Sequence, residues 1–388
     1  MSFLKNTLLN SSKIATPAYY FDLDEFSNRV KYVSKCFENI PLTYSIKANP
    51  FLLVNLPTEL QHVEVCSPGE LEICKKYGIT GNKIIYSGVN KEFCDVYDAI
   101  SYDVDIVTAE SKKHIEVEQR VSSRLDCKQK VIFRLTSGNQ FGMSEEDIIS
   151  VLENANEYPN LIFYGIHFYA GTQKKAKQIE RDIEKLERFL DKLEKEYGFC
   201  SQLVEIGPGL AVEYFTKEYN EREAEEIEKV VEIIKRVEKK YPVGIEMGRF
   251  LAASCGTYTT CIKDIKTNDD VNYLICDGGI HHLKYYGQTM AMQVPMLEVL
   301  TKKNSNKKNY CICGSLCTVA DVLIRDVELE KVEEGDILAF HRCGAYSITE
   351  GSSLFLSRDL PQVFCYNQKN GVIKARDIVQ TFEMNIMR

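Results

Sequence analysis

Short apolar segments rich in β-branched residues recur eight times between residues 42 and 246, and this regularity limits the folds open to the chain. Stretches long enough for a helix separate neighbouring segments. The expected strands are Leu42–Ile46, His62–Cys66, Lys83–Tyr86, Val104–Val107, Lys130–Arg134, Leu161–Phe168, Leu203–Ile206 and Val243–Glu246. Strand and helix alternating eight times is the pattern of a (β/α)8 barrel, an α/β fold.

Helical periodicity is clearest in two of the intervening stretches. From Lys174 to Tyr197, and again from Asn220 to Tyr241, apolar residues recur three or four apart with charged residues between them. One buried stripe on a charged surface is typical of a helix that covers a barrel. Pro242 is expected to end the second helix.

The pattern changes after Leu251, where long helical periodicity disappears. The segments that follow read as strands, with Tyr273, Ile275, Cys311 and Ile337 on buried faces. We expect a barrel over residues 28–251 and a β domain, a sandwich or small barrel, over residues 1–27 and 252–388. The segment Ala18–Asp22 falls in that β domain, and joining the barrel is its alternative. The expected strands of the β domain are Thr257–Ile265, Val271–Asp277, Asn309–Gly314, Val322–Leu329 and Asp336–Arg342.

Charge and hydropathy exclude several classes of protein. The chain has 48 basic and 56 acidic residues, a formal net charge of -8, and no long basic cluster. These features argue against a nucleic-acid partner bound through its phosphates. The chain lacks an apolar run of about 18 residues, so no membrane span is expected. Its polar beginning is unlike a secretory signal, and we expect a cytoplasmic protein.

The 14 cysteines are scattered through strand-like segments. In a chain of this size a reduced, cytoplasmic state is a better interpretation than a disulfide framework. The closely spaced Cys311, Cys313 and Cys317 raise a metal site as an alternative. Because no second cysteine pair or nearby histidine has zinc-like spacing, we expect no metal.

Chemically reactive residues lie at the ends of the expected strands, and a barrel of this kind gathers those ends at one mouth. Lys47 ends the first strand, where a buried ammonium needs either an ion pair or a covalent role as an imine-forming amine. Glu246, Gly248 and Arg249 end the eighth strand. The carboxylate there suits a protonated pyridine nitrogen and the guanidinium suits a phosphate, while an internal Glu–Arg pair is the alternative.

Two further segments support a phosphate-bearing, aromatic ligand. Gly207 and Gly209 follow the seventh strand, where backbone amides can approach an anion, although turns also use such glycines. His167 and Tyr169 are two residues apart and share a face of one strand, so either side chain can pack on an aromatic ring. A hydrogen-bonded structural role is the alternative for His167.

Seven motifs in order make the whole chain resemble the fold-type III pyridoxal-phosphate decarboxylases, a group that includes diaminopimelate, ornithine and arginine decarboxylases and is related to alanine racemase. The motifs are YSIKAN at Lys47, EVCSPGEL at Ser67, GIHFYAGTQ at His167, IGPGL at Gly207, EMGRF at Glu246, GSLCTVAD at Cys317 and GAYS at Tyr346.

The resemblance implies a role for each motif residue. Lys47 holds the aldehyde of pyridoxal 5'-phosphate as an internal imine (Schiff base), and Glu246 pairs with the ring nitrogen. Cys317 reaches the active site of a second subunit and is catalytic, so the enzyme is a homodimer with shared sites. The remaining residues contact the cofactor: Ser67, Arg134, His167, Tyr169, Gly207, Gly209, Gly248, Arg249 and Tyr346.

Departures from the family pattern bear on the substrate. Tyr169 stands where the decarboxylases usually carry a stacking histidine, and Pro208 interrupts the glycine run. Thr318 replaces the acid that holds a distal ammonium in familiar members. His281, His282, Thr318 and Asp321 are candidate substrate contacts. The pattern indicates an amino acid or amino-acid conjugate, carrier-protein-tethered in some relatives, rather than meso-diaminopimelate. Diaminopimelate decarboxylation and racemisation are the alternatives.

Overall fold

The computed structural model describes residues 14–38, 40–301 and 306–387. The chain divides into two compact units. One comprises Ser27–Val212 and Asn220–Leu251. The other comprises Met1–Phe26, Glu213–Tyr219 and Ala252–Arg388.

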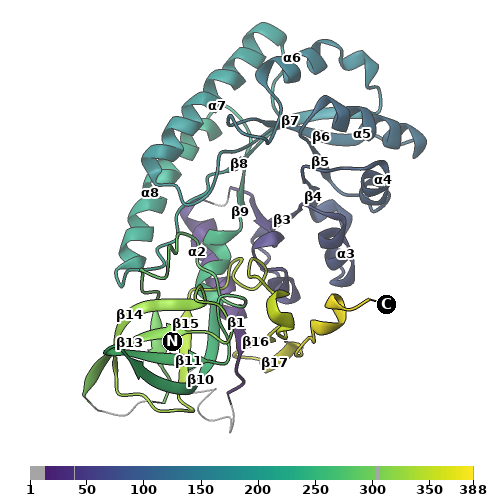
Figure 1. Cartoon of the computed structure of the whole chain (residues 1–388). Coiled ribbons are helices and arrows are strands. Elements are labelled where there is room, and N and C mark those ends of the chain that lie inside the picture. The colour runs from purple at the N-terminus through teal and green to yellow at the C-terminus, as the bar shows by residue number, and fades with distance from the viewer. Residues whose placement is uncertain (1–13, 39, 302–305, 388) are drawn as a thin grey trace. The chain divides into compact units, whose positions relative to one another are not determined.

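Eight parallel strands form a closed barrel in the first unit, which confirms the predicted fold class (Figure 1). All eight expected strands form, with bounds within a few residues of those predicted. They are β2 (Leu42–Ser45), β3 (Leu60–Val65), β4 (Ile84–Tyr86), β5 (Ile106–Ala109), β6 (Gln129–Leu135), β7 (Leu161–Tyr169), β8 (Leu203–Gly207) and β9 (Val243–Met247).

One α-helix precedes β2, and one follows each strand from β3 to β9. These helices are α2 (Leu23–Cys36), which crosses the boundary between the units, α3 (Pro68–Lys76), α4 (Phe93–Ser101), α5 (Lys112–Arg124), α6 (Glu145–Glu153), α7 (Ala176–Tyr197), α8 (Tyr219–Glu238) and α9 (Arg249–Ala252).

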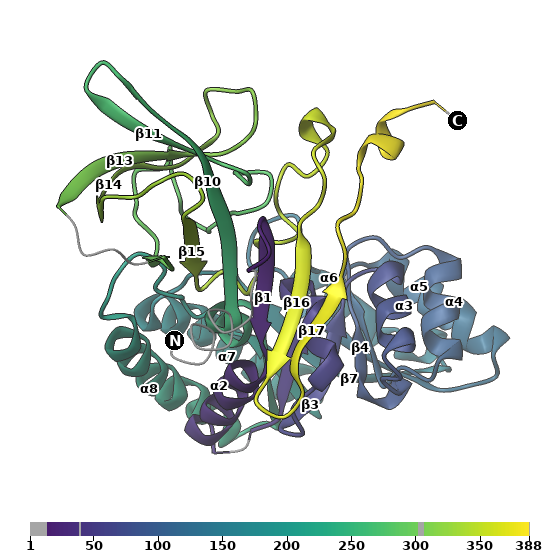
Figure 2. The same ribbon diagram turned by 90° about the horizontal axis from the view of Figure 1, so that it is seen from below.

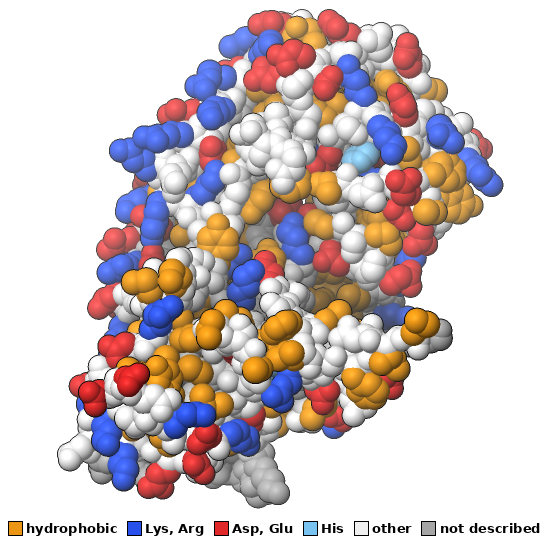
Figure 3. All heavy atoms as spheres, in the orientation of Figure 1, with side chains coloured by type: hydrophobic (Ala, Val, Ile, Leu, Met, Phe, Trp, Pro, Cys, Tyr) orange, Lys and Arg blue, Asp and Glu red, His pale blue; other side chains and the backbone are white. Residues whose placement is uncertain are grey.

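The helix α7 illustrates how the pattern becomes structure. Its apolar stripe, including Ile183, Leu186 and Leu190, is buried, and basic and acidic side chains alternate over the outer surface of α7 and α8 (Figure 3). The helix begins two residues later than expected because Lys174 stays extended and donates its backbone N–H to Gly209. Gly198, with φ of +65°, ends it in the left-handed conformation that glycine adopts without strain.

The second unit contains a nine-stranded sheet, in which β1 (Ala18–Asp22) lies between two later strands (Figure 2). β1 pairs antiparallel with β10 and parallel with β16, so the alternative in which this segment joins the barrel is wrong. The other strands are β10 (Gly256–Asn268), β11 (Val271–Cys276), β12 (Leu297–Val299), β13 (Lys307–Cys313), β14 (Val322–Glu330), β15 (Ile337–His341), β16 (Gln362–Asn367) and β17 (Gly371–Arg376).

The predicted faces of these strands are correct only in part. Cys311 is buried, but Tyr273, Ile275 and Ile337 are half-buried. Their neighbours Leu274, Cys276 and Leu338 fill the core instead. A shift of one residue exchanges the faces of a strand, so alternation alone left this choice open. Over the described ranges, no helix is long and apolar enough to cross a membrane.

Candidate active site

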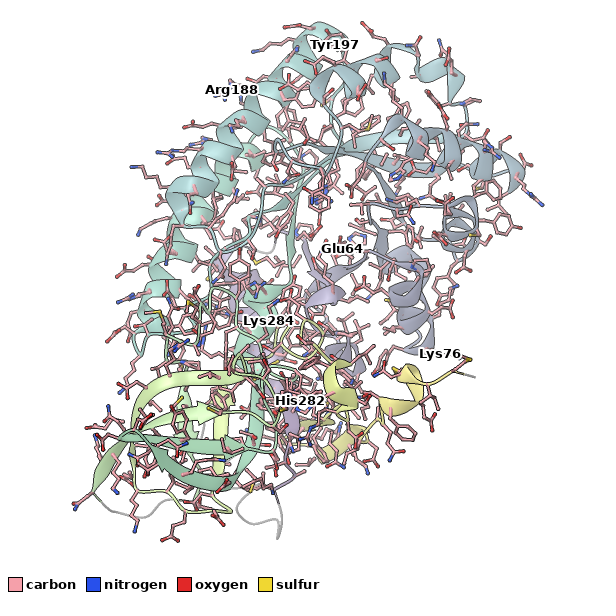
Figure 4. The ribbon with its side chains drawn as sticks, in the orientation of Figure 1. Glu64, Lys76, Arg188, Tyr197, His282 and Lys284 are labelled. Carbon is pink, nitrogen blue, oxygen red and sulfur yellow. The ribbon has the colours of Figure 1, made fainter. Side chains whose placement is uncertain are left out.

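Lys47 lies at the mouth of the barrel, in a short 3-10 turn (Ile46–Ala48) directly after β2. Its Nζ lies 2.8 Å from Oε2 of Glu64 on β3 and 3.9 Å from Oε1 of Glu246. Nζ also donates to Sγ of Cys66 at 3.4 Å. Figure 4 labels Glu64, one of the two buried carboxylates around this amine. The Lys47 ammonium is therefore paired with Glu64, and Glu246 lies within reach of the same amine.

Glu246 is the penultimate residue of β9, and its carboxylate is held by groups from two other strands. Its Oε1 accepts a hydrogen bond from Ser45 Oγ at 3.0 Å, and Oε2 lies 3.1 Å from Nε2 of His167. Burial opposes ionisation, but Lys47, His167 and Ser45 outweigh it and lower the pKa of Glu246 to about 2. The site therefore holds a fixed negative charge at neutral pH.

The Nε of Arg249 is not used for an internal pair with Glu246, the alternative to the predicted phosphate contact. The Nε donates instead to Oγ1 of Thr172, in the loop after β7, at 3.2 Å. Gly248 makes this turn possible, since a Cβ at this position would lie 3.0 Å from Cβ of Ala48.

Tyr169 and His167 project from the end of β7 at different depths. His167 is buried beside Glu246, whereas Tyr169 is half-buried and its ring centroid lies 6.0 Å from Cζ of Arg134. A Cβ at Gly207 would lie 2.7 Å from Cδ2 of Tyr169, so glycine is needed for the ring to lie there. Burial raises the pKa of the Tyr169 hydroxyl, which stays protonated at neutral pH.

Gly209 provides the closest backbone approach at this mouth. Its φ is +63°, and a Cβ there would overlap the carbonyl oxygen of Gly171. Ser67 is the N-cap of α3, where its Oγ accepts the backbone N–H of Glu70 at 3.2 Å. Both positions follow strands of the barrel, as the sequence predicts.

Several residues with side chains at this mouth were not predicted as site residues: Ser45, Glu64, Cys66, Glu110 and Thr172. Glu64 could have been predicted from the sequence, because a charged residue within an apolar strand requires a partner. The Cys66 thiol donates to Glu64 Oε1 at 2.9 Å, and burial together with that carboxylate raises the pKa of the thiol. Cys66 is therefore a neutral thiol in this setting.

Cys317 and Thr318 lie in a loop of the second unit. Cys317 is exposed and Thr318 is half-buried. Asp321 is buried and accepts backbone N–H groups from Ile280 at 2.8 Å and Leu316 at 2.7 Å. These bonds indicate that Asp321 fixes the loop, and its predicted substrate contact stays a prediction.

The remaining predicted residues of this unit are His281, His282 and Tyr346. His282, labelled in Figure 4, is buried with Nδ1 3.0 Å from the Tyr258 hydroxyl and Nε2 2.9 Å from the Asp359 carbonyl. Burial lowers the pKa of His281 to about 3 and that of His282 to about 4. Tyr346 has a φ of +65° in the loop after β15. A direct substrate contact by either histidine remains a prediction.

The barrel residues fit pyridoxal phosphate. A lysine amine and an ionised carboxylate share one mouth, and Nδ1 of the buried His167 lacks a hydrogen-bond partner among the described residues. Glycines at 207, 209 and 248 leave space that a Cβ would fill. All 14 cysteines are free, and within residues 14–38, 40–301 and 306–387 no cluster of three His, Cys, Asp or Glu could hold a metal.

Comparisons with known proteins agree with this chemistry. A diaminopimelate decarboxylase from Aquifex aeolicus is 25% identical and covers 93% of this chain and 89% of its own. The L-glutamyl-[BtrI acyl-carrier protein] decarboxylase of Niallia circulans is 26% identical and covers 96% and 94%. The 2-[(L-alanin-3-ylcarbamoyl)methyl]-2-hydroxybutanedioate decarboxylase of Staphylococcus aureus is 24% identical and covers 90% and 94%.

A crystal structure shares the fold across nearly the whole chain. Diaminopimelate decarboxylase from M. jannaschii, in complex with L-lysine, aligns with a TM-score of 0.84 and 22% identity, covering 98% of this chain and 94% of that one. The family model of the pyridoxal binding domain of pyridoxal-dependent decarboxylases matches residues 23–253. The chain therefore belongs to the pyridoxal-dependent decarboxylases, enzymes whose cofactor is pyridoxal phosphate, as its motifs predicted.

Proposed function

We propose that this enzyme decarboxylates an amino-acid conjugate whose distal end carries no free ammonium. The observation that carries the proposal is Thr318, which follows Cys317 and supplies no negative charge. A distal ammonium taken out of water requires an anion, and a hydroxyl does not replace one. Free meso-diaminopimelate is therefore a poorer fit.

A cavity of about 560 Å³ in the second unit supports this substrate class. Its apolar wall includes Met290, Val319 and Phe340, and the cations Lys284 and Arg325 also line it. Nζ of Lys284, which is labelled in Figure 4, lies 3.6 Å from Oε2 of Glu350. Glu350 also lines the cavity and offsets part of the positive charge. Such a lining favours an extended neutral or anionic group over an ammonium.

The barrel residues at the mouth are proposed to hold and orient the cofactor. Pyridoxal phosphate, when bound, withdraws the electrons left on the α-carbon as carbon dioxide departs. Lys47 holds the cofactor covalently, and Glu246 keeps a proton on its ring nitrogen. Glu64 holds a proton at Nζ of Lys47 whenever that amine is free. The residues proposed to bind and orient the cofactor are Ser67, Arg134, His167, Tyr169, Gly207, Gly209, Gly248, Arg249 and Tyr346.

Cys317 is proposed to act in the active site of a second copy of the chain. The loop that carries it is presented outward, with Cys317 exposed and Val319 fully exposed. Cys317 would return a proton to the α-carbon after carbon dioxide leaves. We propose that this homodimer works in a reducing compartment such as the cytoplasm. Such a compartment keeps the 14 cysteines free.

The named relatives support both substrate classes at similar identity, so the order of the two candidates rests on Thr318. The acyl-carrier-protein and butanedioate-conjugate enzymes act on conjugates by their names, whereas the Aquifex aeolicus enzyme acts on diaminopimelate at similar identity. Diaminopimelate is therefore the second candidate. A carrier protein that presents the substrate is compatible with the first.

The test is release of carbon dioxide from a panel of substrates by the purified holoenzyme. The panel contains meso-diaminopimelate, L-glutamyl pantetheine thioester and the alanyl-carbamoyl conjugate of the Staphylococcus aureus relative. We expect turnover of a conjugate, and loss of that turnover in Thr318→Glu but not in the matched control Thr318→Ser. Preferential turnover of meso-diaminopimelate by the wild type would contradict the proposal.

A further inference from the structure

Glu110, directly after β5, connects three segments at the mouth of the barrel. It is buried, and its two carboxylate oxygens bind different partners. Oε1 accepts a hydrogen bond from NH1 of Arg134 at 2.7 Å, and Oε2 accepts one from the backbone N–H of Gly142 at 3.3 Å. We propose that Glu110 is a positioning residue that fixes Arg134 against Tyr169 and thereby shapes the cofactor site.

The backbone of Glu110 is itself held in place. Its N–H donates to Nδ1 of His114, in the first turn of α5, at 3.2 Å. Burial lowers the pKa of His114 to about 4, so the ring is neutral and its nitrogen can accept this bond at neutral pH. The carboxylate therefore projects from an anchored position.

The loop after β6 closes on Glu110 through a glycine. Thr136 and Met143 are joined by a backbone hydrogen bond of 2.9 Å, and Met143 donates to the carbonyl of Arg134 at 2.8 Å. Gly142 has a φ of +79°, and a Cβ there would lie 2.7 Å from the Arg134 carbonyl oxygen. Only a glycine can bring its N–H to Glu110 in this conformation.

Arg134 is held on three sides as a result. Its Cζ lies 4.8 Å from the ring centroid of Phe141, in the same loop, and 6.0 Å from that of Tyr169 on β7. Its side chain is 11% exposed, and Glu110 supplies the counter-charge. A planar guanidinium fixed in this way limits the rotation of the Tyr169 ring, which also lies against Gly207.

The consequence for the cofactor rests on the proposed placement of Tyr169 beside its ring. If Glu110 is neutral, Arg134 loses its ion pair. Arg134 then no longer holds the Tyr169 ring in a fixed position. We expect weaker binding of pyridoxal phosphate in addition to any loss of protein stability.

The chain provides a matched control on the same pair of strands. Asp105, directly before β5, binds Nζ of Lys130 on β6 at 2.8 Å, and its other oxygen lies 3.1 Å from Nε2 of His62. This carboxylate also bridges β5 and β6, but from the amino ends of the strands. Asp105→Asn therefore removes a similar charge without touching the proposed site.

The experiment measures pyridoxal phosphate affinity by equilibrium dialysis and the free energy of unfolding by urea for the cofactor-free full chain. We expect both Glu110→Gln and Asp105→Asn to lower stability, and only Glu110→Gln to raise the Kd, by roughly tenfold. Glu110→Asp, which keeps the charge, should recover part of the affinity. Adding Glu110→Gln to Arg134→Lys should raise the Kd little further, because both act on one pair.

Two results would overturn the inference: equal Kd values for Glu110→Gln and Asp105→Asn, or additive effects with Arg134→Lys. If Glu110→Gln does not fold, the pyridoxal phosphate Kd values of Glu110→Asp and Arg134→Lys decide whether the Glu110–Arg134 pair shapes the cofactor site. A wild-type chain that binds no pyridoxal phosphate would contradict the proposed function itself, which distinguishes the two failures.

Discussion

Two carboxylates share the space around the Lys47 amine, and their surroundings separate their roles. Glu64 lies 2.8 Å from Nζ and also accepts the Cys66 thiol, whereas Glu246 lies 3.9 Å away and is held by Ser45. Glu64 is thus the immediate partner of the amine. Glu246 remains available, with His167 beside it, for a second cation at the mouth.

Replacing Glu64 by Gln tests this division at the residue scale. The amide keeps the shape but removes the negative charge that holds a proton at Nζ. We expect kcat for the accepted substrate to fall by roughly 10–100-fold, with a smaller change in pyridoxal phosphate affinity, because Lys47 itself is retained.

Glu64→Asp is the control, since it keeps the charge on a shorter side chain and should retain more activity than the amide. Steady-state kinetics and cofactor dialysis measure both quantities. Equal activity of Glu64→Gln and the wild type would assign Lys47 a different partner during turnover.

At the scale of elements, the loops after β7 and β8 support each other. Lys174 donates its backbone N–H to the Gly209 carbonyl at 2.9 Å, and Ala211 donates to Lys174 at 3.0 Å. Gly209 also lies against the Gly171 carbonyl. One glycine therefore sets the spacing of two loops that carry proposed phosphate-binding groups.

Gly209→Ala and Gly198→Ala separate backbone strain from this close approach. Both glycines have a φ near +60°, at +63° and +65°, but nothing lies within 4 Å of a Cβ at Gly198. We expect Gly198→Ala to cost about 1–2 kcal/mol of stability with unchanged cofactor affinity. Gly209→Ala should cost roughly 2–5 kcal/mol and also weaken cofactor binding.

Urea denaturation and dialysis measure the two effects. If the two alanine variants have the same affinity for pyridoxal phosphate, the loop spacing at Gly209 does not shape the cofactor site.

At the scale of the whole molecule, a carboxyl group inside the barrel makes stability depend on pH. Glu205 on β8 is buried beside Gly244, where a Cβ would overlap its carboxylate. Burial raises the pKa of Glu205 from 4.5 to about 8. Between these values the folded chain holds one proton more than the unfolded chain, so this group lowers the free energy of unfolding as pH rises.

Glu205→Gln should remove that contribution. The wild type is expected to lose about 1.4 kcal/mol per pH unit relative to Glu205→Gln across the window from pH 4.5 to 8. Urea denaturation of the cofactor-free chains at several pH values measures the difference. Parallel curves would show that Glu205 does not keep its proton in the folded state.

The sequence predicts the barrel well because the eight strands carry a strong apolar signal and their ends carry reactive residues. The β domain is less predictable: β12, β16 and β17 were not expected. The pattern is weak in β12, which has three residues, and in β17, which is mostly exposed. Glu110 and Thr172 were missed because their importance comes from neighbours distant in sequence. Only the folded chain shows that Glu110 meets Arg134 and Gly142.

The roles proposed for the barrel residues all require that Lys47 holds the cofactor. Borohydride reduction of the pyridoxal phosphate-loaded chain, followed by peptide mass mapping, tests it most directly. We expect a stable pyridoxyl phosphate label on Lys47 that is absent from Lys47→Ala. A label on another lysine of the native enzyme, with Lys47 unmodified, would contradict it.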